Sequence, residues 1–88
     1  MERLAGKVAV VTGASKGMGR HFVEALVGAG MRVACLARPS EELSSLATQF
    51  GDAALPVGCD VASPEAVDAA IAKTVERFGR IDVVVANA

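Results

Sequence analysis

The 88-residue sequence predicts an α/β fold built on a doubly wound, parallel β-sheet. Short, continuous apolar runs typical of buried strands alternate with longer segments whose apolar residues recur every three or four positions. The order β-α-β-α-β-α-β requires helical crossovers between parallel strands, and such crossovers are right-handed. Pro56 lies inside the third apolar run, so that strand is expected at an edge and the expected strand order is 3-2-1-4.

The first strand is expected at residues 7–12, KVAVVT, which are apolar enough for a strand that is buried on both faces. A helix is expected to follow over residues 17–28. Its inner side, which packs on the sheet, is expected to carry Phe22, Leu26 and Ala29.

The second strand is expected at residues 32–37, RVACLA. Ser40 can cap the next helix, whose first turn holds Glu41 and Glu42 near the positive end of the helix dipole. Gly51 is expected to end this helix. The inner side is expected to carry Leu43, Leu46, Ala47 and Phe50, which are spaced as one helical face.

The third strand is expected at residues 54–58. Ser63 can cap the third helix, with Pro64 at its first position and Gly79 at its end. The inner side of this helix is expected to carry Val67, Ala70, Ile71, Thr74, Val75 and Phe78. The fourth strand is expected at residues 81–88, IDVVVANA.

Composition and charge argue against several classes of protein. The net charge of −1 gives no reason to expect a nucleic-acid or membrane partner, and no apolar run approaches the roughly 18 residues of a membrane helix. The first seven residues carry no apolar signal segment, so we expect a cytoplasmic location. Cys35 and Cys59 form no CxxC pair and His21 is the only histidine, so we expect buried thiols, a surface or packing histidine and no metal site.

Three glycines follow the first strand in the stretch VVTGASKGMGR, residues 10–20. Gly13 lets the chain leave the strand sharply, while Gly17 and Gly19 remove side chains where the backbone must approach a ligand and where the helix packs on the sheet. Ligands of doubly wound sheets bind at this position, and a helix N-terminus favours a diphosphate. A glycine-rich turn without a ligand is the alternative.

Residues 12–19 read T-G-x-x-x-G-x-G, which resembles the cofactor motif of the short-chain dehydrogenase/reductase (SDR) family. Asp60 and Val61, just past the third strand, are similar to the family's segment whose Asp meets the adenine ring. The resemblance covers the whole chain. It implies a Rossmann-type domain, of which residues 1–88 are the N-terminal, NAD(P)-binding half.

Residues 86–88, Ala-Asn-Ala, are similar to the start of the family's N-N-A-G motif, with Ala86 in the place of its first Asn. The motifs together imply a set of cofactor-binding residues at the ends of the strands. These are Gly13, Ser15, Lys16, Gly17, Met18, Gly19, Arg38, Asp60, Val61, Asn87 and Ala88.

Arg38 indicates which dinucleotide binds. A site for an unphosphorylated ribose places an acidic residue at the end of the second strand, where its carboxylate accepts a hydrogen bond from the 2′-OH. Here Ala37 and Arg38 stand at that position, and a guanidinium suits phosphate oxygens. Lys16 can add a second positive charge. We therefore expect NADP as the cofactor, in preference to NAD.

Two other phosphate-handling sites do not fit these residues. A Walker-type loop needs a glycine where Met18 stands. A phosphoacceptor receiver domain could use Asp60, but it also needs acidic residues after the first strand to hold a metal. Thr12 and Gly13 stand there instead.

The resemblance implies an NADP-dependent oxidoreductase that reduces carbonyls or oxidises alcohols, with a small-molecule substrate and a homo-oligomeric complete protein. The family's catalytic Ser and Tyr-x-x-x-Lys follow the fourth strand, and this sequence has no Tyr. We therefore expect no catalytic residue among residues 1–88, which would then be a fragment or a truncated product. The alternative function is a non-catalytic dinucleotide-binding or interaction module.

Overall fold

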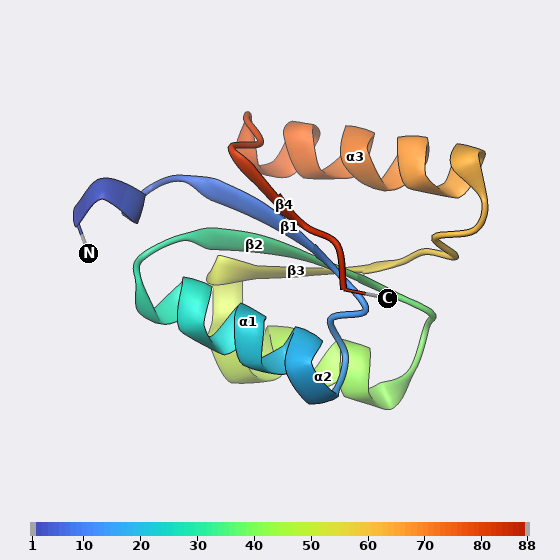
Figure 1. Ribbon diagram of the computed structural model, residues 1–88, viewed down its shortest axis with the longest axis horizontal. Coiled ribbons are helices and arrows are strands. Elements are labelled where there is room, and N and C mark those ends of the chain that lie inside the picture. The colour runs from blue at the N-terminus through green and yellow to red at the C-terminus, as the bar shows by residue number, and fades with distance from the viewer. Residues whose placement is uncertain (1, 88) are drawn as a thin grey trace.

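The computed structural model describes residues 2–87 and shows a four-stranded parallel sheet with the strand order β3-β2-β1-β4 (Figure 1). The strands are β1 (Val8–Thr12), β2 (Arg32–Ala37), β3 (Ala54–Gly58) and β4 (Val83–Val85), and the helices are α1 (Gly17–Gly28), α2 (Glu41–Phe50) and α3 (Pro64–Phe78). Short 3₁₀ helices lie at Glu2–Leu4 and Gly51–Ala53. The predicted α/β class, the parallel strand order and the edge position of the proline-containing strand are confirmed.

The sheet separates two apolar layers. Figure 1 shows α1 and α2 together on one face and α3 on the other. The layer under α1 and α2 includes Ala9, Val11, Val33, Cys35, Val23, Leu43 and Leu46. The layer under α3 includes Val10, Ala34, Leu36, Val57 and Ala70. Successive residues of β1 and β2 therefore enter opposite layers, which explains why both strands are apolar throughout.

The predicted caps of α2 and α3 are confirmed. The Ser40 hydroxyl accepts a hydrogen bond from the Leu43 amide (3.0 Å), and the Ser63 hydroxyl accepts one from the Ala66 amide (3.3 Å). Gly79 ends α3 in the left-handed region with φ of 83°. These signals act within three or four residues, so the sequence alone was sufficient to place both helix starts.

Helix α1 is rotated relative to the prediction. Val23 is completely buried, whereas Phe22 is 36% exposed. The buried line of α1 runs through Gly19 and Val23, because a residue without a side chain lets the helix start lie against the preceding turn. The predicted inner position of Phe22 is therefore wrong, and so are those of Ala47 and Val75, which are exposed.

Strand β4 is shorter than the predicted residues 81–88, and that boundary is wrong. It pairs with β1 only along Ala9–Val11. Just before β4, the amide of Asp82 donates to the Val8 carbonyl (2.8 Å), and the Asp82 carboxylate accepts from the Val8 amide (2.9 Å). The first amide of β1 is thus bonded by a side chain, and the paired strand begins after Asp82.

Candidate functional site

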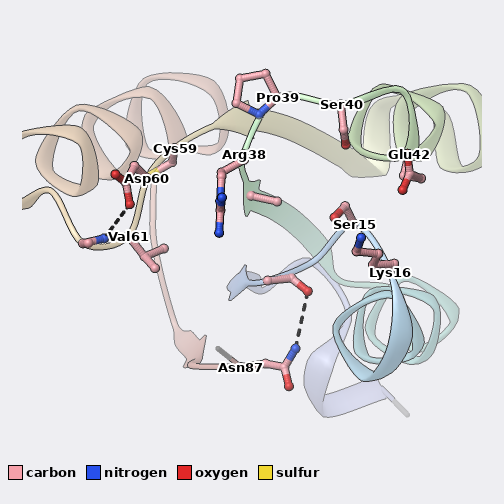
Figure 2. Close-up of a pocket in the computed structure, with 13 residues that line it drawn as sticks. Ser15, Lys16, Arg38, Pro39, Ser40, Glu42, Cys59, Asp60, Val61 and Asn87 are labelled. Atoms are coloured by element: carbon pink, nitrogen blue, oxygen red, sulfur yellow. Dashed lines mark hydrogen bonds between the residues drawn. The ribbon is translucent and has the colours of Figure 1, made fainter.

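A cavity of about 710 Å³ opens at the carboxyl ends of the strands (Figure 2). Four parts of the chain line it: the turn between β1 and α1, the segment from the end of β2 to the first turn of α2, the segment after β3, and Asn87 after β4. These parts are far apart in the sequence. They meet here because the carboxyl ends of parallel strands share one edge of the sheet.

Most of the predicted cofactor-binding residues line this cavity, namely Gly13, Ser15, Lys16, Arg38, Asp60, Val61 and Asn87. Gly17, Met18 and Gly19 are not part of its lining. They form the first turn of α1, where Met18 is 63% exposed. The remaining predicted residue, Ala88, lies outside the described residues.

The prediction missed several further lining residues, which are Ala37, Pro39, Ser40, Glu42, Cys59 and Ala62. Most of them adjoin a predicted residue in the chain, so their place at a strand's carboxyl end was the signal that could have found them. Glu42 is different, because the first turn of α2 brings it to the cavity from beyond the strand.

The glycines of the turn have distinct structural reasons. Gly13 and Gly17 have φ of 61° and 60°, a region that side chains with a Cβ adopt only with strain. A Cβ on Gly13 would overlap the backbone oxygen of Asn87, and a Cβ on Gly19 would overlap the backbone oxygen of Gly13. Both of these contacts are internal to the protein, so the turn needs Gly13 and Gly19 for packing whether or not a ligand binds.

Asn87 ties the end of β4 to this turn. Its amide donates to the hydroxyl oxygen of Thr12 (2.9 Å), and its side-chain Nδ2 donates to the carbonyl of Gly13 (3.4 Å). Figure 2 shows the second of these bonds at the edge of the cavity. The motif residues at the ends of β1 and β4 therefore hold each other in place.

The N-terminus of α1 differs from those of the other two helices. Its N-cap residue, Lys16, has an extended backbone and makes no side-chain capping bond, whereas serine side chains cap α2 and α3. The first amides of α1 are therefore not bonded by a cap side chain. Such amides, together with the helix dipole, favour an anionic ligand.

The cavity wall carries charges of both signs. Lys16 and Arg38 are exposed, and Figure 2 shows Arg38 reaching from the end of β2 toward the middle of the cavity. Glu42 and Asp60 are the acidic residues of the wall, and the Asp60 carboxylate accepts a hydrogen bond from the Ala62 amide (2.9 Å). Because the two signs balance, their placement decides which part of a ligand binds where.

Both cysteines are buried and free, as predicted, and Cys35 lies in the layer under α1 and α2. Burial raises the pKa of the Cys35 thiol to about 12, although the Arg20 guanidinium opposes this rise. The thiol of Cys35 therefore stays protonated at neutral pH, and a protonated thiol is a poor nucleophile.

Residues 2–87 hold neither a cluster of metal-ligating side chains nor a membrane-spanning helix. Within that range, no three His, Cys, Asp or Glu side chains are grouped in a way that could hold a metal ion. None of the helices in this range has the length and apolar character needed to cross a membrane.

The family model described as short chain dehydrogenase matches residues 7–88. The chain therefore belongs to the short-chain dehydrogenase family. The resemblance that the glycine turn indicated is confirmed.

Two curated relatives of the chain are longer proteins. Sorbitol dehydrogenase of Cereibacter sphaeroides is 40% identical over 86 residues, which are 98% of this chain and 34% of that enzyme. Cis-1,2-dihydrobenzene-1,2-diol dehydrogenase of Pseudomonas putida is 43% identical over 86 residues, covering 98% of this chain and 31% of the enzyme. The chain thus spans about a third of the length of these relatives.

Solved structures agree with the fold. A 3-ketoacyl-(acyl-carrier-protein) reductase from Brucella melitensis, in complex with NADH, has a TM-score of 0.88 and 34% identity, over 92% of this chain and 33% of that one. The C-domain of a bacterial malonyl-CoA reductase with NADP has a TM-score of 0.89 and 30% identity, over 96% of this chain and 15% of that one. Relatives with this fold therefore bind either form of the nicotinamide dinucleotide.

Proposed function

We propose that this chain is the cofactor-binding part of an NADP-dependent oxidoreductase, and that residues 1–88 are the N-terminal half of its Rossmann-type domain. One observation carries the proposal. Arg38 and Lys16 both line the cavity, and β2 ends without the carboxylate that a free ribose 2′-OH would need. Both cations suit a 2′-phosphate, and the guanidinium also matches its oxygens in shape.

The cavity suits the adenine ring and the 2′-phosphate of the cofactor, and the start of α1 suits its diphosphate. Val61 provides an apolar side chain and Asp60 a carboxylate for the adenine ring, while Arg38 and Lys16 provide positive charge for the 2′-phosphate. The amides at the N-terminus of α1 are suited to the diphosphate. The rest of the proposed set is Gly13, Ser15, Gly17, Met18, Gly19, Asn87 and, beyond the described residues, Ala88.

The chemistry is divided between the cofactor and the protein. A bound nicotinamide dinucleotide would donate a hydride to a carbonyl in its reduced form, or accept one from an alcohol in its oxidised form. The residues of this chain bind and orient the adenosine end, and the proposed catalytic Ser and Tyr-x-x-x-Lys are not among residues 1–88. The proposed complete protein is a cytoplasmic homo-oligomer that acts on a small carbonyl or alcohol.

Titration of NADPH and NADH against the protein at its full natural length tests the cofactor proposal. Wild type is expected to bind NADPH more tightly than NADH. Arg38→Ala is expected to weaken the binding of NADPH about ten- to a hundredfold, because hydrogen bonds to charged groups contribute about 1.5–3 kcal/mol. The affinity for NADH should barely change, because no 2′-phosphate is present.

Arg77→Ala is a matched control. Arg77 lies on α3 in an exposed ion pair with Asp52 (3.6 Å) and is not part of the cavity wall. Equal losses of both cofactors in Arg38→Ala, or tighter binding of NADH by wild type, would contradict the NADP proposal. NADPH binding without turnover of any aldehyde, ketone or alcohol would support the non-catalytic module instead.

A further inference from the structure

Arg20 makes four hydrogen bonds from α1, and all four acceptors lie outside that helix. Its Nη1 donates to the carbonyl oxygens of Ser15 (3.1 Å) and Glu42 (3.0 Å). Its Nη2 donates to the hydroxyl oxygen of Ser45 (3.1 Å) and the amide oxygen of Gln49 (2.8 Å). A single side chain therefore joins the glycine-rich turn to helix α2.

These bonds leave the terminal nitrogens of Arg20 no spare hydrogen. A guanidinium has five N–H donors, four of them on the terminal nitrogens, and each of those four has an acceptor in the protein. A phosphate could take their place only if the protein bonds broke. Arg38, by contrast, is an exposed residue of the cavity wall. The two arginines near the cavity therefore have different roles.

The bond to Ser15 orients Lys16, the N-cap residue that precedes α1. Because a trans peptide is planar, the carbonyl of Ser15 and the amide of Lys16 move as one rigid unit. Lys16 makes no side-chain capping bond of its own. Arg20 thus fixes the orientation of the Ser15–Lys16 peptide, and with it the direction in which the Lys16 side chain leaves the turn.

The other three bonds position α2. Glu42, Ser45 and Gln49 are spaced by three and four residues, so they share one face of the helix. Glu42 also lines the cavity, and Figure 2 shows it on the same side of the cavity as Ser15. One guanidinium thereby holds two parts of the cavity wall at a set distance.

We propose that Arg20 is a positioning residue that fixes the Ser15–Lys16 turn against α2 and thereby supports recognition of the 2′-phosphate. The inference rests on the proposed function, because it places Lys16 at that phosphate. Loss of Arg20 weakens NADPH binding about tenfold, by analogy with the lower end of the loss seen at metal sites when a partner that orients a ligand is removed. The binding of NADH is weakened much less, because NADH has no 2′-phosphate for Lys16 to contact.

The test measures NADPH and NADH dissociation constants for wild type, Arg20→Ala and Arg20→Lys in the protein at its full natural length. A lysine keeps the positive charge but cannot reach four acceptors. Both variants are therefore expected to lose selectivity for NADPH, whereas a purely electrostatic role predicts wild-type selectivity in Arg20→Lys. Arg77→Lys is the matched control. Hydrogen exchange without cofactor is expected to be faster at residues 15–17 in both Arg20 variants.

The double variant Ser45→Ala, Gln49→Ala keeps Arg20 and removes only its side-chain acceptors on α2. It decides the matter if the Arg20 variants do not fold, and it is expected to lose NADPH selectivity severalfold. Wild-type selectivity for NADPH in Arg20→Lys overturns this inference but leaves the proposed function standing. An equal loss of affinity for NADPH and NADH does the same. If the Arg20 variants do not fold, wild-type selectivity in the double variant has that meaning. A wild-type protein that binds neither cofactor overturns the proposed function and the inference with it.

Discussion

Gly19 is the residue of the turn with the least room for a side chain. A Cβ there would overlap the carbonyl oxygen of Gly13, which is backbone and cannot rotate away. Gly28, in the same helix, has nothing within 4 Å of the position of a Cβ. The two glycines therefore form a matched pair within α1.

Gly19→Ala is expected to lower the free energy of unfolding by about 1–3 kcal/mol or more, the usual cost of overpacking. Gly28→Ala should leave it unchanged or raise it by up to about 1 kcal/mol, since alanine is the better helix former. Urea unfolding of both variants measures the difference. Equal stability of the two variants would show that the turn can shift to make room for a Cβ at residue 19.

At this scale, the sequence predicted residues whose spacing and strand-end position indicate a phosphate site. Gly13, Lys16 and Arg38 are examples, and all three line the cavity. Arg20 was not predicted, because its acceptors on α2 lie 22 to 29 residues away and no local pattern marks them. The close approach of Asn87 to Gly13 was also not predicted, since it depends on how two strands pair.

The ends of the elements follow local rules, and their faces follow the packing of the whole fold. Serine caps and a left-handed glycine act within one turn, so both capped helices begin where the sequence predicts. The face of α1 depends on Gly19 lying against the preceding turn, and the length of β4 depends on its pairing with β1. Apolar periodicity favoured an inner position for Phe22, because a periodic pattern contains no information about such non-local contacts.

Asp82 links β4 to β1 and gives that link a pH dependence. Hydrogen bonds from the Arg80 side chain (2.7 Å) and from the Val8 amide (2.9 Å) lower the pKa of the Asp82 carboxyl from its ordinary value of 3.8. A carboxyl whose pKa is lower in the folded state contributes stability above its unfolded pKa. That contribution is lost as the pH falls through the folded pKa.

Asp82→Asn is therefore expected to make the free energy of unfolding less dependent on pH below about pH 4, the range in which aspartates take up protons. Asp52→Asn, which changes a fully exposed carboxylate, should follow the wild-type pH profile more closely. Urea unfolding from pH 2 to 7 compares the three proteins. An Asp82→Asn profile parallel to that of wild type would show that the link carries no pH dependence.

On the scale of the whole molecule, the strand order is the one that Pro56 predicted by marking β3 as an edge strand. That order puts β4 at one edge of the sheet, next to β1. Among residues 2–87, no strand pairs with the outer side of β4. Its Val83 is 38% exposed and its Val84 is 60% exposed, so an apolar strand presents open backbone groups to its surroundings.

Such an edge is a template for pairing with another chain. The 88-residue chain by itself is therefore expected to be poorly folded or to associate with itself, with β4 covered by neighbouring protein. Val84→Lys should reduce the association, because a charged edge residue disfavours strand pairing. Val61→Lys, which changes an exposed valine outside β4, serves as the control. Sedimentation velocity reports the association, and hydrogen exchange reports protection of residues 82–86. A compact wild-type monomer with strongly protected amides in that segment would show that β4 is stable as a free edge.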